Sequence, residues 1–232
     1  MSGPVRFFQG QISLDGPSGT GKSSVARAVA ARLDAAYLDT GAMYRAATVA
    51  VLDAGVDPED GEAVAGVVAA ARIEVGTTAG AELVQVDGVD VAERIRGAEV
   101  TRAVSPVSAV PAVRRLLVDR QRALVAAADA VVVEGRDIGT VVLPDATLKV
   151  YLTAAPEARA DRRAGQLGVT DPARIAHIAA DLRRRDEYDS SREDSPLRPA
   201  LDAIVVDSTG LDREAVVERV LDLARTAVGE PA

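Results

Sequence analysis

The most constraining feature of the sequence is a glycine-rich stretch, GPSGTGKS, at residues 16–23. It matches the G-x-x-x-x-G-K-[ST] phosphate-loop pattern, and its flanks supply the context that the pattern needs. An apolar run, QISLD (11–15), precedes it as a predicted strand, and VARAVAARL (25–33) follows with apolar residues at helical spacing. Backbone N–H groups of such a loop and the positive end of the following helix surround phosphates. The stretch therefore predicts a bound nucleoside triphosphate, but it leaves the phosphoryl acceptor open.

Two residues of this loop have individual roles in the prediction. Lys22 is expected to reach the β- and γ-phosphates, and Ser23 is expected to offer its hydroxyl to Mg²⁺. The residues predicted to bind the triphosphate are Gly16, Pro17, Ser18, Gly19, Thr20, Gly21, Lys22, Ser23 and Ser24.

Beyond the loop, short apolar runs alternate with segments whose apolar residues recur at helical spacing. This alternation predicts an α/β fold of the P-loop NTPase type, in which helices flank a central parallel sheet. The expected strands are 35–39, 130–135, 146–154 and 203–210, and the expected helices are 40–55, 96–110, 111–127, 156–168, 171–188 and a last one after residue 210.

Residues 73–91 break this alternation. Short β-branched runs are separated there by TTAG and by Asp87-Gly88, and the Asp-Gly pair is a strong hairpin signal. The segment therefore predicts a small antiparallel sheet inserted into the α/β chain.

Composition limits the class of ligand. A net charge of -8 argues against nucleic-acid or anionic-membrane binding, so an anionic ligand needs a local cluster of arginines. The absence of cysteine excludes disulfides and thiolate metal sites, and a single histidine, His177, argues against a histidine-dependent triad. No secretory signal and no run of 18 uncharged apolar residues is found, which predicts a cytoplasmic protein without a membrane span.

Arginines stand where an α/β sheet places its ligands, beyond the carboxyl ends of the strands. Arg45 follows the second predicted strand, and Arg136 and Asp137 directly follow the strand 130–135. A phosphate that accepts a phosphoryl group needs several fixed cations, because two anions must approach each other. Residues 156–200, however, contain nine arginines and nine acidic residues, so solvated helix faces are the alternative interpretation there.

A GTPase switch is an alternative from another class. It needs a guanine-binding motif such as N-K-x-D, and the chain has no asparagine. Its D-x-x-G match, DSTG at 207–210, follows the last predicted strand and is predicted to be a strand-to-helix turn.

Four motifs together resemble the bacterial cytidylate kinase family: GPSGTGKSS, YLDTGAMYR, VVVEGRDIGTVVLPDA and RRDEYDSSREDSPL, in that order. The likeness covers about residues 11–225. It implies a monomeric nucleoside monophosphate kinase that transfers the γ-phosphate of ATP to CMP or dCMP with Mg²⁺. It also implies a core (about 10–64, 109–156 and 171–227), an NMP-binding insertion (about 65–108) and a lid (about 157–170).

The resemblance also implies roles for individual residues, taken over by motif position. Arg45, Arg136 and Arg192 would hold the acceptor phosphate, and Ser105, Arg114 and Asp137 would recognise cytosine. Arg185 and Asp189 would meet the ribose, Thr40 would help to seat the nucleotide, and the lid residues Arg159 and Arg163 would close over the transferring phosphate. The residues expected to be catalytic are Lys22, Arg136, Arg159, Arg163 and Arg192. Glu134 stands where the family commonly has aspartate, so a role in organising the metal stays open.

The base assignment agrees with hydrogen-bond chemistry. A carboxylate accepts from the exocyclic amine of cytosine, whereas uracil would turn a carbonyl oxygen towards the same carboxylate. Because the acceptor is already an anion, the chemistry needs no strong general base. The alternatives are a UMP/CMP kinase of broader specificity, another small-molecule P-loop kinase and a non-enzymatic nucleotide switch.

Overall fold

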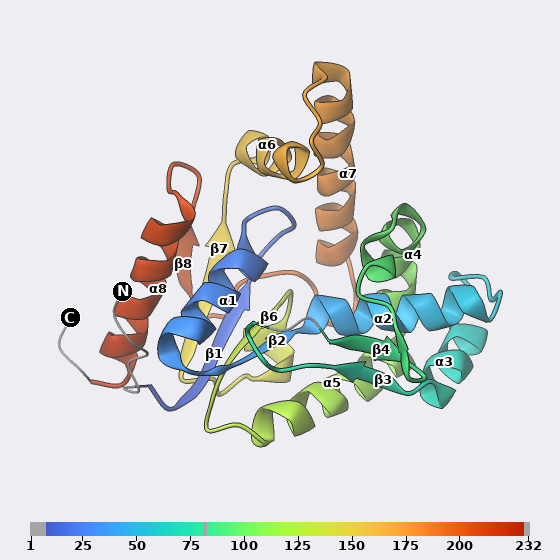
Figure 1. Ribbon diagram of the computed structural model, residues 1–232, viewed down its shortest axis with the longest axis horizontal. Helices are drawn as coiled ribbons and strands as arrows, with labels where there is room; N and C mark the ends of the chain where they lie inside the picture. The colour runs from blue at the N-terminus through green and yellow to red at the C-terminus, as the bar shows by residue number, and fades with distance from the viewer. Residues whose placement is uncertain (1–7, 81–82, 230–232) are drawn as a thin grey trace.

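A five-stranded parallel sheet forms the centre of the computed structural model, which describes residues 8–80 and 83–229 (Figure 1). The strand order β2-β6-β1-β7-β8 puts the strand that leads into the phosphate loop in the middle. The strands are β1 Gly10–Asp15, β2 Ala36–Asp39, β6 Ala130–Gly135, β7 Leu148–Thr153 and β8 Ile204–Asp207. The predicted α/β fold with a central parallel sheet is confirmed.

Helices cover both faces of the sheet. The α-helices are α1 Lys22–Leu33, α2 Thr40–Asp53, α3 Gly61–Ala70, α4 Ala98–Ala109, α5 Pro111–Ala126, α6 Pro156–Gln166, α7 Pro172–Ser190 and α8 Arg213–Ala227, with the short elements η1 Arg94–Arg96 and η2 Ile138–Val142. The sequence pattern did not predict α3, whose first turn is capped by the Asp60 carboxylate accepting from the Ala63 N–H at 3.1 Å.

Alternation along β6 divides the apolar core between the two faces. Val131 and Val133 pack with α2, α4 and α5, whereas Val132 packs on the opposite side with α1 and α8. Successive side chains of a strand point to opposite faces, so a run of valines places apolar side chains on both faces of the sheet. The sheet is thereby fixed between two apolar layers, and its carboxyl edge is left for polar residues.

The predicted antiparallel sheet is present. It contains β3 Ile73–Val75, β4 Val84–Val86 and β5 Val89–Asp90, and it packs against α2. Asp87 and Gly88 form the hairpin turn with positive φ of 52° and 82°, which is why an Asp-Gly pair serves here. Residues 81–82 of the predicted segment lie outside the described residues.

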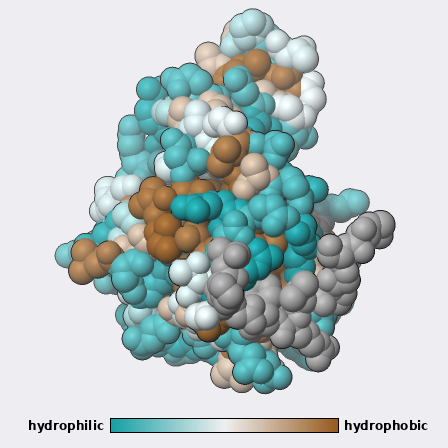
Figure 2. Space-filling view, turned by 90° about the vertical axis from the view of Figure 1, so that its left-hand side faces the viewer, coloured by the Kyte–Doolittle hydropathy of each residue, from teal (hydrophilic) through white to brown (hydrophobic). Residues whose placement is uncertain are grey.

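Helices α6 and α7 stand over the carboxyl edge of the sheet, above the loop that follows β1 (Figure 1). On the side that carries α8 and β8, Figure 2 shows apolar surface among the polar residues. The exposed large apolar side chains in and beside the edge strand β8 are Leu201, Ile204, Val205 and Leu211. Within the described residues, none of the helices combines the length and apolarity needed to cross a membrane.

Candidate active site

The loop between β1 and α1 requires glycine at defined positions. Gly16 has a φ of 144°, and a Cβ there would lie 2.0 Å from the carbonyl oxygen of Leu152. Gly21 precedes the first residue of α1 with a φ of 93°, a conformation that glycine adopts without strain. The loop therefore passes close to β7 and ends at the N-terminus of α1, the end of a helix that favours anions.

Lys22 is buried at the beginning of α1. Its Nζ donates to the carbonyl oxygen of Pro17 at 2.7 Å, within the loop itself. Burial and the nearby Arg136 guanidinium lower the pKa of Lys22 to about 7, against the opposing effect of Glu134. A buried ammonium is unfavourable without a nearby anion, so Lys22 suits a phosphate ligand.

Glu134, the penultimate residue of β6, faces Ser23 from across the loop. Its Oε2 accepts from the Ser23 hydroxyl at 2.8 Å, and its Oε1 accepts from the Tyr37 hydroxyl. Burial and the neighbouring Asp39 raise the pKa of Glu134 to about 7. The described residues contain no cluster of three or more histidine, cysteine or acidic side chains that could hold a metal alone. A hydroxyl beside one carboxylate suits Mg²⁺, which takes one or two protein oxygens and completes its shell with phosphate and water.

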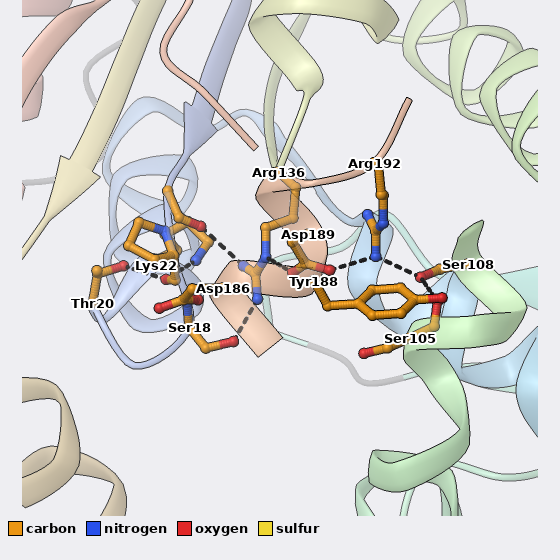
Figure 3. A network of polar contacts seen from close by, with 12 residues as sticks. Ser18, Thr20, Lys22, Ser105, Ser108, Arg136, Asp186, Tyr188, Asp189 and Arg192 are labelled. Atoms are coloured by element: carbon orange, nitrogen blue, oxygen red, sulfur yellow. Dashed lines mark hydrogen bonds and ion pairs between the residues drawn. The ribbon is translucent and has the colours of Figure 1, made fainter. Parts of the chain in front are cut away.

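Arg136 joins the phosphate loop to α7 (Figure 3). Its Nη1 donates to the Gly16 carbonyl oxygen at 2.9 Å, its Nη2 to the Ser18 hydroxyl at 2.5 Å, and its Nε to Asp189 Oδ2 at 2.9 Å. Burial acts to lower the pKa of Arg136, but the Asp189 carboxylate outweighs it and the pKa is raised. The guanidinium is thus charged and held on three sides.

Asp189 is the centre of this network. Its second carboxylate oxygen accepts from Arg192 Nη2, which also donates to the Ser108 hydroxyl of α4 at 2.8 Å (Figure 3). Burial acts to raise the pKa of Asp189, but Arg136 and Arg192 hold it below its usual range. One carboxylate therefore sets the spacing of two arginines that are predicted to hold the acceptor phosphate.

Arg114 and Asp137 form a buried ion pair beside this network. Arg114 Nη1 also donates to the Ser108 carbonyl oxygen at 3.3 Å, and its guanidinium lies over the Tyr44 ring, 5.4 Å from the centroid. Ser105 lies one turn before Ser108 on α4, where its carbonyl oxygen accepts from the Ser108 hydroxyl at 3.0 Å. The three residues predicted to recognise cytosine therefore come from α4, α5 and the turn after β6.

Three more predicted residues lie around this centre. Arg45 on α2 donates to the Ile95 carbonyl oxygen at 2.9 Å and to the Thr101 hydroxyl at 3.2 Å, and burial with the charge of Arg185 lowers its pKa to about 10. Thr40 donates to the Glu134 carbonyl oxygen at 2.7 Å. Arg185 has a lowered pKa because it is buried near Arg136, and its Nε has no hydrogen-bond partner within the described chain.

The two predicted lid arginines differ in their surroundings. Arg159 is buried, where it donates to the Ser18 carbonyl oxygen at 3.1 Å and pairs with Asp186. Arg163 is only partly buried, and it donates locally to Gln166 Oε1 at 3.1 Å. The structure therefore brings Arg159, but not Arg163, into contact with the phosphate loop.

Four residues outside the predicted set also belong to the site: Asp15, Ser108, Arg162 and Asp186. Asp186 Oδ1 accepts from the Ser18 backbone N–H at 3.2 Å, and Arg162 donates to the Thr20 carbonyl oxygen at 3.3 Å and the Ser208 hydroxyl at 2.9 Å. The sequence offered a usable signal for Asp15, because an acidic residue ends an apolar strand there. It offered no signal that Ser108 belongs to the site.

Comparisons with known proteins agree with this arrangement. A family model described as cytidylate kinase matches residues 12–226. A cytidylate kinase of Rhodococcus jostii (strain RHA1) is 54% identical over 222 residues, covering 94% of this chain and 97% of the relative. A cytidylate kinase of Nocardia farcinica (strain IFM 10152) is 54% identical over 212 residues, or 90% of each chain. Among solved structures, a gluconokinase from Sinorhizobium meliloti 1021 covers 95% of this chain and 94% of its own with a TM-score of 0.53, and its 18% identity indicates a shared fold only.

Proposed function

Since the chain belongs to the cytidylate kinase family, we propose that it transfers the γ-phosphate of ATP to CMP or dCMP, giving ADP and CDP or dCDP. The observation that carries the proposal is the position of Arg136. One guanidinium is bonded both to the phosphate loop, through Gly16 and Ser18, and to the acceptor-side carboxylate Asp189. A kinase that transfers a phosphoryl group between two bound nucleotides needs a cation between their phosphates.

On the donor side, the loop 16–24 surrounds the ATP phosphates, with backbone N–H groups other than that of Pro17, which has none, as donors, and Lys22 exchanges its contact with Pro17 for a phosphate oxygen. Ser23, with Glu134 beside it, is the proposed Mg²⁺ ligand. Bound there, the ion supplies positive charge that offsets the charge developing on the transferred phosphoryl group.

On the acceptor side, Arg45, Arg136 and Arg192 bind the phosphate of CMP. Each is an arginine, whose planar fork suits phosphate oxygens. Asp189 and Arg185 are proposed to hydrogen-bond to the ribose. The two ion pairs of Asp189 also fix the spacing of Arg136 and Arg192. Thr40 seats the nucleotide from the start of α2.

Base selection falls to Arg114 and Asp137, with Ser105 from α4. The buried carboxylate accepts from the cytosine amine, and the guanidinium donates to the ring acceptors. Uracil would place a carbonyl oxygen against Asp137 and leave two buried acceptors facing each other, so CMP is preferred to UMP.

Catalysis then depends on positioning and charge. The acceptor phosphate is already ionised, so no side chain has to remove a proton from it. Residues 65–108 serve as the NMP-binding insertion and 157–170 as the lid, which carries Arg159 and Arg163 over the transferring group. Their closure excludes water and so prevents hydrolysis of ATP. We also propose that the working enzyme is a cytoplasmic monomer with nucleotides as its only partners, which the net charge of -8 supports.

The test is ADP release from Mg-ATP with a panel of CMP, dCMP, UMP, AMP and GMP. CMP and dCMP are expected to be the best acceptors, and a much higher kcat/KM with AMP or GMP would overturn the proposal. Comparable rates with UMP would favour the broader UMP/CMP kinase. Tight ATP binding without turnover on any acceptor would identify a nucleotide switch.

A further inference from the structure

Asp15, the last residue of β1, is buried directly before the phosphate loop and is only 5% exposed. Its Oδ1 accepts from the Ile138 N–H at 2.9 Å, and its Oδ2 accepts from the Gly139 N–H at 2.7 Å. Both amides belong to the turn that carries Arg136 and Asp137. One carboxylate from the donor strand therefore holds two consecutive amides of the acceptor turn.

Backbone hydrogen bonds of the sheet do not hold this turn. The pairing of β1 with β6 ends at Asp15 and Gly135, and residues 138–142 continue in the irregular element η2. Within residues 8–80 and 83–229, the side-chain hydrogen bonds between this part of the chain and the turn are those of Asp15 and the two from Arg136 to Gly16 and Ser18. The Arg136 side chain is long and is proposed to bind the ligand, whereas the short Asp15 side chain accepts its two hydrogen bonds from backbone amides.

The fit around Asp15 is close. A Cβ added at Gly139 would lie 2.9 Å from Ser13 Oγ and 3.4 Å from Asp15 Oδ2. Burial raises the pKa of Asp15 to about 6, in opposition to the two amide hydrogen bonds and Lys22, which lower it. A buried carboxylate is unfavourable unless it is hydrogen-bonded, and an apolar residue would leave two buried amides without partners. The close fit and these energetic costs indicate that Asp15 is present because it binds the amides of the turn.

We propose that Asp15 is a positioning residue for phosphoryl transfer: it fixes the acceptor turn, residues 136–139, at a set distance from the donor loop. This proposal rests on the functions proposed above for Arg136 and Asp137. In-line transfer requires both phosphates at near-attack distance, and a displacement of about 1 Å reduces the rate by about 100-fold. Loss of Asp15 therefore impairs the transfer step, while each half-site still binds its own nucleotide.

The first experiment is Asp15→Asn. Asparagine keeps the size but accepts at only one atom, and its NH₂ group faces the second amide N–H. We expect kcat to fall roughly 10- to 100-fold, while calorimetric Kd values for CMP and for the analogue AMP-PNP each change less than about 3-fold. An unchanged kcat would overturn the proposal, and so would Kd values that weaken in step with kcat, since these indicate a general structural role.

A second variant approaches the same contact from the turn. Gly139→Ala would place a Cβ 2.9 Å from Ser13 Oγ and 3.3 Å from Lys149 Cδ, which should displace the turn that Asp15 holds, and Gly210→Ala is its control, because Gly210 is exposed after β8 with no atom within 4 Å of an added Cβ. We expect Gly139→Ala, but not Gly210→Ala, to reproduce the kcat loss with preserved Kd values. If the two alanine variants have the same kcat and Kd values, the proposal is contradicted. This comparison also holds if Asp15→Asn fails to fold.

Amide hydrogen exchange separates this proposal from the proposed function. Ile138 and Gly139 are expected to lose protection in Asp15→Asn, at least 10-fold in exchange rate, whatever the acceptor of the wild-type enzyme. Unchanged protection would overturn the role of Asp15 itself. Absence of CMP kinase activity in the wild-type protein would instead overturn the proposed function.

Discussion

The donor and acceptor halves of the site are built in different ways. The donor loop is one contiguous stretch, 16–24, in which glycines with positive φ lead into α1, and its backbone N–H groups are proposed to bind the phosphates. The acceptor half combines side chains from α2, α4, α5, the turn after β6 and α7, and most of them are held by ion pairs and hydrogen bonds to one another. The first half depends on local backbone geometry, whereas the second depends on the tertiary fold.

This difference predicts different responses to mutation. A change in the donor loop should remove one function and leave the rest of the site intact. A change in the acceptor network should release a partner charge, and so affect stability, phosphate binding and base choice together.

The largest effect is expected for Lys22→Ala, which removes the lysine proposed to bind the donor phosphates. We expect kcat/KM for ATP to fall by about 10³-fold, since one fixed donor to the developing charge contributes that order of magnitude. Thermal unfolding should change little, because the hydrogen bond of Lys22 within the described residues is to the Pro17 carbonyl oxygen of the same loop. The matched control is Lys149→Ala, which removes the other lysine of the chain, one that pairs with Asp202.

The next effect tests the acceptor network at its centre. Asp189→Asn should lower kcat/KM for CMP by about 100-fold and the free energy of unfolding by about 3 kcal/mol, because two largely buried guanidinium groups, 21% and 8% exposed, lose their common anion. The control is Asp181→Asn on the same helix, whose carboxylate is 62% exposed. A stable variant with normal CMP kinetics would refute the idea that Asp189 holds the two arginines.

The same substitution has a pH signature. The folded-state pKa of Asp189 is below the usual 3.8, so its stabilisation is fully present above about pH 4 and is lost as the pH falls through the folded value. The difference in unfolding free energy between wild type and Asp189→Asn should therefore be constant near neutral pH and shrink below pH 4. Urea titrations across this range measure it, and a difference that grows on acidification would contradict the assignment.

A smaller effect is expected for base selection. Asp137→Ala removes the carboxylate proposed to distinguish the cytosine amine from the uracil carbonyl, so the ratio of kcat/KM for CMP over UMP should fall by roughly 10- to 100-fold. The KM for CMP should also rise, because Arg114 loses its buried partner. If the ratio is unchanged, Asp137 has no part in base recognition.

The smallest effect is expected for Arg163→Ala. Arg163 is partly buried and bonds to Gln166 on its own helix, so its removal should lower kcat by less than about 5-fold. Arg159→Ala should lower kcat by about 100-fold, because Arg159 contacts the loop through Ser18 and pairs with Asp186. Steady-state rates of the two variants decide whether both arginines or only Arg159 act at the transferring phosphate.

The sequence predicts most of the elements, because their signals are local. The phosphate loop, the alternating strands and the Asp87-Gly88 hairpin all follow from neighbouring residues. Helix α3 was missed because Gly61 and Gly66 weaken its pattern, although the capping aspartate Asp60 was a usable signal.

The pairing within the site could not be predicted from spacing alone. Arg114 and Asp137 are 23 positions apart, and Ser18 and Asp186 are 168 positions apart. The charge pattern of residues 156–200 does not distinguish a buried arginine such as Arg159 from an exposed one such as Arg184, since both lie on helices rich in both charges. Only the packing of α6 and α7 over the sheet edge separates them.

The lowered pKa of Lys22 also makes this residue a chemical handle. Burial lowers the pKa of its amine to about 7, which makes Lys22 more nucleophilic than an ordinary lysine, whereas Lys149 is engaged by the Asp202 carboxylate. Because these are the only lysines in the chain, a small acylating probe should mark the phosphate loop with little background from other side chains. The scarcity of lysine thus provides a direct optical or mass-spectrometric reporter of nucleotide occupancy in the unmutated protein.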